Sequence, residues 1–225
     1  MNKEQLYNDL KKQILTLVLE PGTSLDEQSL SERYSISRTP LREVFRKLAG
    51  EGYLNIVNNR GASVSSMNHK VVRDFFVTAP MLYAAVGRLA AENARPEQID
   101  AMKLAQSRFR QASADADAGE MVYWNDQFHS LMGDMADNPY LLPSYNRLLI
   151  DHARISQTFY RPRNTDMSDR VNTAVDHHEQ MIEAIEQGDS QRMVDLIVEH
   201  WELSHDLMDY FVRPDPLPIT ELASL

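Results

Sequence analysis

The sequence predicts a mainly α-helical protein, with a winged helix-turn-helix at the N-terminus followed by an all-α helical bundle of about six helices. Two observations predict this. The first 66 residues show three helical patterns and then two short extended runs, and from about residue 68 only amphipathic helical patterns follow. We therefore expect four segments: a winged helix-turn-helix (1–66), a linker (67–72), a helical domain (73–213) and a proline-containing tail (214–225).

Three helices and a hairpin account for the N-terminal segment. Pro21-Gly22 separates the first helix from the second. Ser37 is suited to cap the third helix, and Pro40 falls in its first turn, where a missing N–H costs nothing. The expected helices span about 4–19, 26–34 and 38–50, and the extended runs lie near 54–57 and 62–65, joined by a polar turn at 58–61.

Amphipathic helices account for the remainder of the chain. Their boundaries are marked by proline and glycine, at Arg95-Pro96, Asn138-Pro139, Pro162 and Gly188-Asp189. The expected ranges are about 69–94, 97–116, 119–136, 140–160, 168–187 and 190–211. Helices of this length predict a bundle.

Composition excludes several classes of protein. The chain has 225 residues, of which 43% are hydrophobic and 25% charged, so it holds enough apolar mass for one large domain or two modest ones. It has no cysteine, which excludes a disulfide framework, a thiol nucleophile and every thiolate metal site. The N-terminal residues do not form a signal peptide, and no run of about 18 apolar residues occurs. We expect a cytoplasmic protein with no membrane partner.

The formal net charge of -10 argues against a nucleic-acid partner until it is divided by segment. Residues 1–66 carry nine Lys and Arg against eight Asp and Glu, a net of +1, which leaves -11 for residues 67–225. From Arg33 to Lys47, five basic residues face one acid, Glu43. A local basic patch therefore lies within the predicted helix-turn-helix.

The third helix has the residues of a DNA-reading helix. Arg38 and Arg42 are one turn apart and share a face, and arginine makes bidentate contacts to guanine. Ser37 and Thr39 can donate to phosphate at the exposed helix start. The opposite face carries the apolar residues Leu41, Val44, Phe45 and Leu48. The alternative is an ordinary solvated basic helix, which the surrounding order of helices, turn and wing disfavours.

Histidine spacing predicts a metal site in the bundle. Asn125 and His129 are four residues apart and point inward with apolar neighbours. His178 and His200 each lie eleven residues from the turn at Asp189, so an antiparallel helix pair brings them to the same level. Three imidazoles and an amide oxygen suit Zn²⁺, Ni²⁺ or Mn²⁺. His152 could join this pocket, and the alternative for each histidine is a hydrogen-bonded core residue.

The N-terminal segment resembles the DNA-binding domain of the GntR transcriptional regulators. The resemblance is carried by Pro21-Gly22, Leu25, Leu30, the run Ser37-Arg38-Thr39-Pro40-Leu41-Arg42-Glu43, Leu48, Gly52 and Arg60-Gly61. It implies DNA contacts from the third helix, the second helix and the wing, at Ser37, Arg38, Thr39, Arg42, Gln28, Asn58, Arg60 and Gly61. Gln28 stands where some members carry arginine, and Phe45 and Arg46 stand where small or apolar residues are common.

The helical segment resembles the ligand-binding domain of the FadR-like branch, the FCD type. The resemblance is carried by 125–129, by 178–185 with Gly188-Asp189, and by His200. It implies a metal held by Asn125, His129, His178 and His200, and a small carboxylate effector nearby. Ala79 and Tyr83 stand about where an arginine and a glutamate are expected, so the charge partner of a simple dicarboxylate is missing.

These patterns favour a homodimeric transcriptional regulator, with repression as the expected sign. Its expected partners are double-stranded DNA with a short pseudo-palindromic site and a small-molecule effector, such as an organic acid, bound in the helical domain. One alternative is a metal-dependent hydrolase or lyase, but Asp126 and Glu179 are turned about 100° from the ligand positions and supply no general base. Another is a regulator whose metal is structural, absent or itself the signal. We expect no enzymatic activity.

Overall fold

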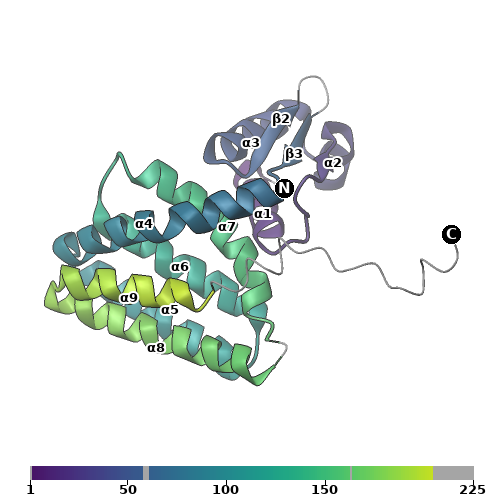
Figure 1. Cartoon of the computed structure of the whole chain (residues 1–225). Coiled ribbons are helices and arrows are strands. Elements are labelled where there is room, and N and C mark those ends of the chain that lie inside the picture. The colour runs from purple at the N-terminus through teal and green to yellow at the C-terminus, as the bar shows by residue number, and fades with distance from the viewer. Residues whose placement is uncertain (1, 58–60, 163, 205–225) are drawn as a thin grey trace, which may run out of the picture.

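A computed structural model describes residues 2–57, 61–162 and 164–204, and it confirms the predicted fold class. A small N-terminal domain, here called the reader domain, lies at one end of a helical bundle (Figure 1). The reader domain comprises α1 (Lys3–Leu15), β1 (Ser24–Leu25), α2 (Glu27–Tyr34), α3 (Arg38–Glu51), β2 (Leu54–Val57) and β3 (Gly61–Val64). The bundle comprises α4 (His69–Asn93), α5 (Pro96–Ala114), α6 (Ala118–Ala136), α7 (Leu142–Phe159), α8 (Thr165–Gln187) and α9 (Ser190–Glu202).

The wing is a three-stranded antiparallel sheet in the order β1-β3-β2. The hairpin pairs Leu54 with Val64, and β1 adds a two-residue edge at which Ser24 pairs with Ser63. The sequence did not predict β1, because two residues are too few to show a period. Leu25 of this strand is buried in the reader core, together with the apolar faces of the three helices.

Two helices end before their predicted ends. The first helix ends at Leu15 rather than near 19, because Thr16 caps it and Leu17 takes a left-handed φ of 59°. α4 begins at His69, as predicted, because the Asn68 side chain accepts a hydrogen bond from the backbone N–H of Val71; its first turn lies within the segment 67–72 that was expected as linker. The last helix ends at Glu202 within the described residues, and the expected tail lies outside them.

Helix α7 joins the two domains by presenting a different face to each. Ile150 is buried within the reader core, and Arg154 Nη1 donates to the backbone oxygen of Ser65, just after β3, at 2.8 Å. Gln157 Nε2 donates to the backbone oxygen of Leu15 at 3.3 Å. Arg154 is fully buried and paired with Asp151, so the contact with the reader domain includes a buried ion pair.

The bundle has its own core, formed from the inner faces of its helices. Among the described residues, no helix combines the length and the apolar character needed to cross a membrane.

Candidate metal centre and DNA-reading surface

The exposed surface of the reader domain carries the predicted reading helix. Ser37 occupies the cap position of α3 but makes no capping hydrogen bond with its side chain, so its hydroxyl is available. The opposite face of α3 is buried as predicted, at Leu41, Val44, Phe45 and Leu48. Thr39, Arg38 and Arg42 are all exposed. Phe45, which departs from the family pattern, is a core residue here.

A groove of about 440 Å³ runs between α2, α3 and the wing, and we call it the reading groove. Its basic lining residues are Arg38, Arg42 and Arg46, and Asp26, Glu27 and Gln28 line the facing side. Arg42 Nε lies 2.9 Å from both carboxylate oxygens of Glu27, so Glu27 holds the guanidinium by one edge while its terminal nitrogens, Nη1 and Nη2, make no hydrogen bond within the described residues.

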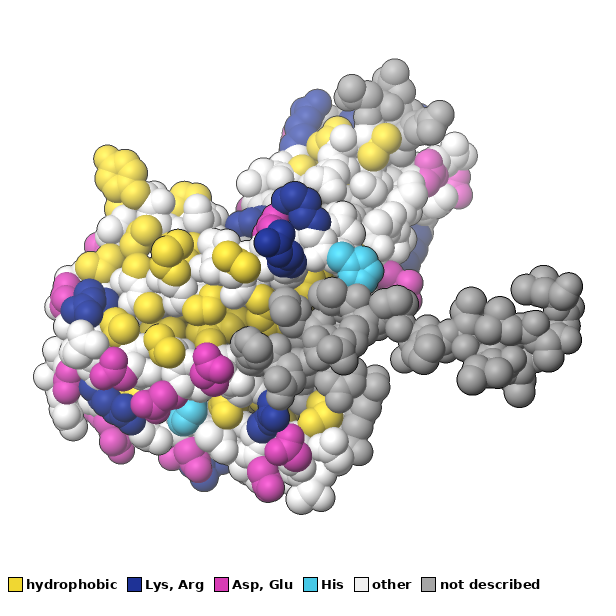
Figure 2. All heavy atoms as spheres, in the orientation of Figure 1, with side chains coloured by type: hydrophobic (Ala, Val, Ile, Leu, Met, Phe, Trp, Pro, Cys, Tyr) yellow, Lys and Arg dark blue, Asp and Glu magenta, His cyan; other side chains and the backbone are white. Residues whose placement is uncertain are grey.

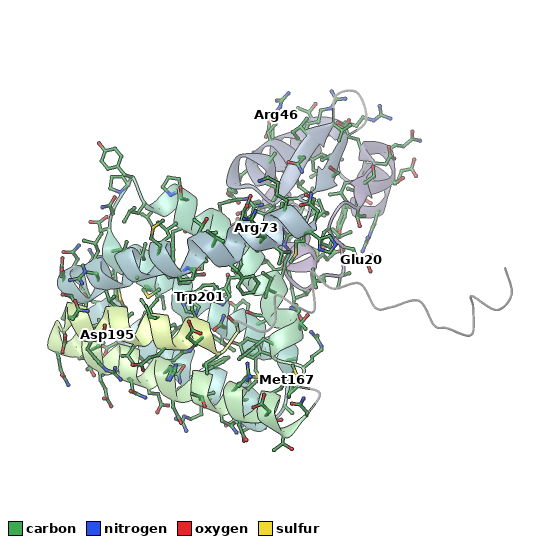
Figure 3. The ribbon with its side chains drawn as sticks, viewed as in Figure 1. Glu20, Arg46, Arg73, Met167, Asp195 and Trp201 are labelled. Carbon is green, nitrogen blue, oxygen red and sulfur yellow. The ribbon has the colours of Figure 1, made fainter. Side chains whose placement is uncertain are left out.

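The other basic residues of α3 are Arg38, Arg46 and Lys47, and among the described residues only Lys47 has a partner. Lys47 Nζ lies 3.8 Å from the centre of the Tyr7 ring, which holds it by a cation–π contact. Arg38 and Arg46 make no hydrogen bond or ion pair within the described part of the chain. Figure 3 shows Arg46 at the outer end of the reader domain, pointing away from the bundle. These two arginines are therefore free to meet phosphate or base edges.

The wing contains one glycine whose position is fixed by sterics. Gly61 has a φ of +92°, and an added Cβ would lie 2.3 Å from the backbone oxygen of Leu25. Gly61 is therefore needed for the approach of β3 to β1, whatever its contact with DNA. Asn58 and Arg60, the other predicted wing residues, lie outside the described residues.

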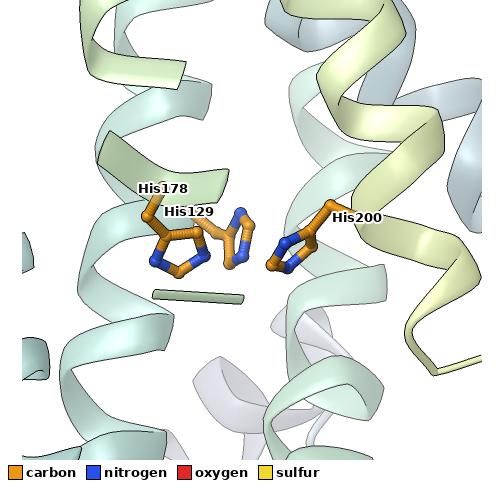
Figure 4. A group of neighbouring side chains, drawn as sticks. All are labelled: His129, His178 and His200. Atoms are coloured by element: carbon orange, nitrogen blue, oxygen red, sulfur yellow. The ribbon is translucent and has the colours of Figure 1, made fainter. Parts of the chain in front are cut away.

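Three of the predicted metal ligands come together inside the bundle. His129 on α6, His178 on α8 and His200 on α9 each offer a ring nitrogen, and these nitrogens all lie within 4.8 Å of one another (Figure 4). The His178 and His200 rings are stacked with centroids 5.0 Å apart, which confirms the level predicted from their equal distances to the turn. We call these three residues the histidine cluster.

A glutamine fixes the proton of His178. Gln106 Nε2 donates to the backbone oxygen of Val175 at 2.9 Å, so its Oε1 faces His178 Nδ1 at 3.1 Å as an acceptor. His178 Nδ1 must therefore carry the proton, and its Nε2 keeps a lone pair. That Nε2 is buried without a hydrogen-bond partner. A hydrogen-bond acceptor behind a free imidazole nitrogen is the usual support of a metal-binding histidine.

Three of the four ring nitrogens of His129 and His200 are also buried without a hydrogen-bond partner, namely both of His129 and Nδ1 of His200. Burial, and then the neighbouring histidines, hold the pKa of His129 and His178 well below the ordinary value. His200 keeps a small exposed fraction, yet burial of most of its ring lowers its pKa to about 3. Neutral imidazoles with free lone pairs fit a divalent metal and leave hydrogen-bonded core histidines as the poorer interpretation.

Asn125 lies one turn before His129 on α6 and is buried. Its Oδ1 accepts a hydrogen bond from the Tyr160 hydroxyl at 2.9 Å, and its Nδ2 has no partner. An amide oxygen has two lone pairs, so one remains for a metal. The role of Asn125 as a ligand stays a prediction.

His152 on α7 faces the cluster. Its ring centroid lies 4.8 Å from that of His129, and its Nδ1 is hydrogen-bonded to the Tyr83 hydroxyl at 2.8 Å. Burial lowers the pKa of His152 to about 4. Tyr83 and Ala79, the residues that replace the expected glutamate and arginine, are both buried in the bundle core. No cation therefore stands at either position.

Sequence reasoning missed three residues that support this site or its link to the reader domain. Gln106 could have been noticed as a polar residue on the apolar face formed by Met102, Ala105 and Phe109. The Asp151–Arg154 pair could not have been noticed in this way. Both faces of α7 are buried, so the spacing of its apolar residues does not show which polar residues are buried.

The comparisons with known proteins agree with this geometry. Residues 2–64 match the family described as bacterial regulatory proteins, gntR family, and residues 79–203 match the FCD domain. The second match spans over half of the chain. The chain is therefore a DNA-binding transcriptional regulator built from a winged helix-turn-helix and an FCD domain. It belongs to the GntR family.

Individual relatives point the same way. The HTH-type transcriptional regulator YdhC of Bacillus subtilis is 26% identical over 90% of this chain and 88% of its own. The HTH-type transcriptional repressor RspR of Escherichia coli is 31% identical over 60% of this chain and 59% of its own. The solved structure of E. coli McbR/YncC has the same fold, with a TM-score of 0.77, 18% identity and coverage of 94% and 98%. YdhC and RspR are named as a transcriptional regulator and a transcriptional repressor.

Proposed function

We propose that this chain is a homodimeric repressor whose helical domain binds a divalent transition metal and a small effector, and that the effector modulates DNA binding. One observation carries the proposal. His129 and His178, which are buried, and His200, which is partly exposed, bring unsatisfied ring nitrogens close together, and α7, which lies beside them, also holds the reader domain. Unsatisfied buried nitrogens are costly, so a ligand for them accounts for their presence.

DNA would enter the reading groove. Arg38 and Arg42 would contact base edges, Arg42 through its terminal nitrogens, and Ser37 and Thr39 would donate to phosphate. The resemblance adds further contacts at Gln28, Asn58, Arg60 and Gly61.

A gel shift on DNA upstream of the chain's own coding sequence tests this assignment. We expect a short inverted repeat to be bound, and Arg38→Ala to weaken specific binding by about tenfold or more. Arg108→Ala is the matched control, since Arg108 is an exposed arginine of α5 far along the chain. Undiminished specific binding by Arg38→Ala would overturn the assignment of α3.

The metal would be held by nitrogens of His129, His178 and His200 and by Asn125 Oδ1. Zn²⁺, Ni²⁺ and Mn²⁺ suit these ligands, and the bound ion would supply positive charge and open positions for oxygen atoms of a ligand. Gln106 would orient His178, and Tyr160 would orient Asn125. The apolar core around them would exclude water.

Elemental analysis of the purified chain tests the metal. We expect about one divalent ion per chain, lost in His178→Ala and kept in His69→Ala, whose histidine is exposed. Melting curves with and without chelator show whether the metal raises the stability of the chain. If it does, but organic acids leave the DNA affinity of the metal-loaded chain unchanged, the metal is structural. A protein that is free of metal and indifferent to chelator would count against all four ligands.

Helix α7 would carry the signal between the domains. Its bundle side bears His152, and Tyr145, whose hydroxyl donates to the backbone oxygen of His129 at 2.9 Å. Its other side bears Ile150 and Arg154, which hold the reader domain. A ligand that moves His129 or His152 would therefore also move the face of α7 that contacts the reader domain. Such a shift of one helix would couple the two sites.

The dimer would form through an apolar face of the bundle. Figure 2 shows hydrophobic side chains gathered over α4 and α9, and three exposed residues lie there: Val77 and Met81, each 70% exposed, and Val198. A second copy is the occupant that a pseudo-palindromic DNA site requires. We expect Met81→Asp to give a monomer by light scattering, whereas Leu104→Asp on α5 stays dimeric. A dimeric Met81→Asp would place the interface elsewhere.

A further inference from the structure

We propose that a cavity between the reader domain and the bundle binds a small zwitterion, a ligand with an ammonium at one end of a short apolar chain and a carboxylate at the other. The cavity lies between α1 and α6 and holds about 620 Å³, and we call it the interdomain cavity. None of the three histidines of the cluster lines it, so the inference does not depend on the metal site. A position between domains and a volume of about 300–1,000 Å³ are typical of small-molecule sites.

The two walls of the interdomain cavity carry opposite charges. The reader wall, from α1, has the basic residues Lys11 and Lys12. The bundle wall, from α6 and its N-cap, has the acidic residues Asp117, Glu120 and Asp126. A ligand with only a negative charge would be repelled by the bundle wall, and one with only a positive charge by the reader wall. A ligand that carries both charges can pair with both walls at once.

Asp126 is the acidic residue of this wall whose charge is unmatched. Asp117 Oδ1 accepts hydrogen bonds from the backbone N–H groups of Gly119 and Glu120, each at 3.0 Å. Glu120 Oε2 accepts a hydrogen bond from Trp124 Nε1 at 3.0 Å. Asp126 is half-buried and makes no hydrogen bond or ion pair within the described part of the chain. Because a carboxylate withdrawn from water is costly without a partner, an ammonium placed beside Asp126 would be stabilised.

The lysines of the reader wall are also available to a ligand. Burial raises the pKa of Asp126 to about 6, and the charge of Lys11 opposes this shift, so Lys11 lies near Asp126. The two side chains nevertheless form no ion pair, and Lys11 Nζ lies 5.5 Å from the centre of the Tyr53 ring. Lys12 is exposed, and its side chain has no hydrogen-bond or ion-pair partner among the described residues. The two ends of a ligand can therefore reach free charges on both walls.

Apolar side chains from three helices also line the interdomain cavity. They are Leu15 of α1, Val122 of α6 and Ala153 of α7. Methylene groups of a ligand would be buried against them, whereas its charged ends would meet the lysines and Asp126. A ligand bound in this way would contact both domains and would stabilise the docking of the reader domain on the bundle.

Calorimetry on the metal-loaded full chain tests the ligand class with three probes that share a six-carbon chain: 6-aminohexanoate, hexanoate and hexylamine. We expect 6-aminohexanoate to bind at least about tenfold more tightly than either probe that carries one charge. The set 3-aminopropanoate, propanoate and propylamine repeats the comparison for a shorter chain. Equal affinities within both sets, or no binding of either zwitterion, would overturn the inference.

Two charge removals test the assignment of the walls. Asp126→Asn should lower the affinity for 6-aminohexanoate to that for hexanoate, whereas Asp100→Asn, at an exposed position of α5, should leave it unchanged. Lys12→Met should weaken 6-aminohexanoate about threefold or more without weakening hexylamine, and Lys70→Met, on the exposed surface of α4, should change neither. Melting curves show that each variant is folded. Unchanged affinity for 6-aminohexanoate in either folded cavity variant would overturn the assignment.

Binding at the histidine cluster is the outcome that must be separated, because these probes include organic acids. We expect 6-aminohexanoate to bind chelator-treated chain and His178→Ala within about twofold of its affinity for the metal-loaded chain, since no residue of the cluster lines the interdomain cavity. Loss of binding in both would place the ligand at the cluster and overturn the inference. A chain that takes up no metal but binds the zwitterion would support this site and overturn the metal site alone.

Discussion

Replacing Arg154 by methionine should lower the stability of the chain by weakening the contact between the reader domain and α7. The Arg154 side chain is fully buried, and it pairs with Asp151, whose side chain is 7% exposed, and with the backbone oxygen of Ser65. Removing one partner of a buried pair costs about 3–5 kcal/mol, because it leaves the other charge uncompensated. Arg147 Nη1 still donates to Asp151 at 2.9 Å, so we place Arg154→Met at the lower end, about 3 kcal/mol.

Thermal unfolding of the metal-loaded chain measures this loss. For a chain of this length, about 3 kcal/mol corresponds to a fall in Tm of about 6–12 °C. The matched control is Arg110→Met, which breaks an exposed pair with Glu179 and should cost under about 1 kcal/mol. The double variant Asp151→Asn, Arg154→Met should recover much of the loss. If Arg154→Met matched the control, the pair would not hold the reader domain and α7 would lose its proposed role.

Four further predictions follow from particular contacts. Gly61→Ala should destabilise the reader domain by more than about 1 kcal/mol, measured by urea unfolding, because of its φ and the clash with Leu25; an unchanged midpoint contradicts this. Glu27→Gln should raise DNA affinity by about two- to fivefold in anisotropy titrations, because it frees Arg42 and removes a charge facing phosphate; weaker binding would show that Glu27 positions Arg42 instead. Gln106→Leu should weaken metal binding by about 10–100-fold with little loss of fold, and equal affinity would deny its orienting role. Metal-free protein should lose stability as the pH falls below about 6.5, because His129, His152, His178 and His200 have lowered pKa values and the unfolded chain takes up more protons; Asp126, whose pKa is raised to about 6, opposes this by one proton, and a flat pH profile would contradict the burial of the histidines.

The sequence predicted the parts of this protein that repeat with a regular period. Apolar spacing placed the helices of the bundle, and equal distances from Asp189 brought His178 to His200. Summing the charge separately for residues 1–66 and 67–225 predicted a basic patch in the N-terminal domain. The same spacing placed Asn125 and His129 on one inward face of α6.

Contacts between distant segments could not be predicted in this way. Arg154 meets Ser65 across 89 positions of the chain, and Gln157 meets Leu15 across 142. No period in the sequence encodes such pairs, because they depend on how the two domains dock. The two residues of β1 and the early end of α1 at Thr16 were missed because local backbone geometry decides them.

The change in operator affinity on ligand binding tests the central claim most directly. Labelled operator DNA would be titrated with metal-loaded wild-type chain, with chelator-treated chain and with His178→Ala, each alone and with a saturating small organic acid that calorimetry has shown to bind the metal-loaded chain. We expect the acid to weaken DNA binding by about 5–150-fold in the metal-loaded chain, and to have no effect in the other two. An acid that binds the metal-loaded chain but leaves its operator affinity unchanged would contradict the coupling of the histidine cluster to the reader domain.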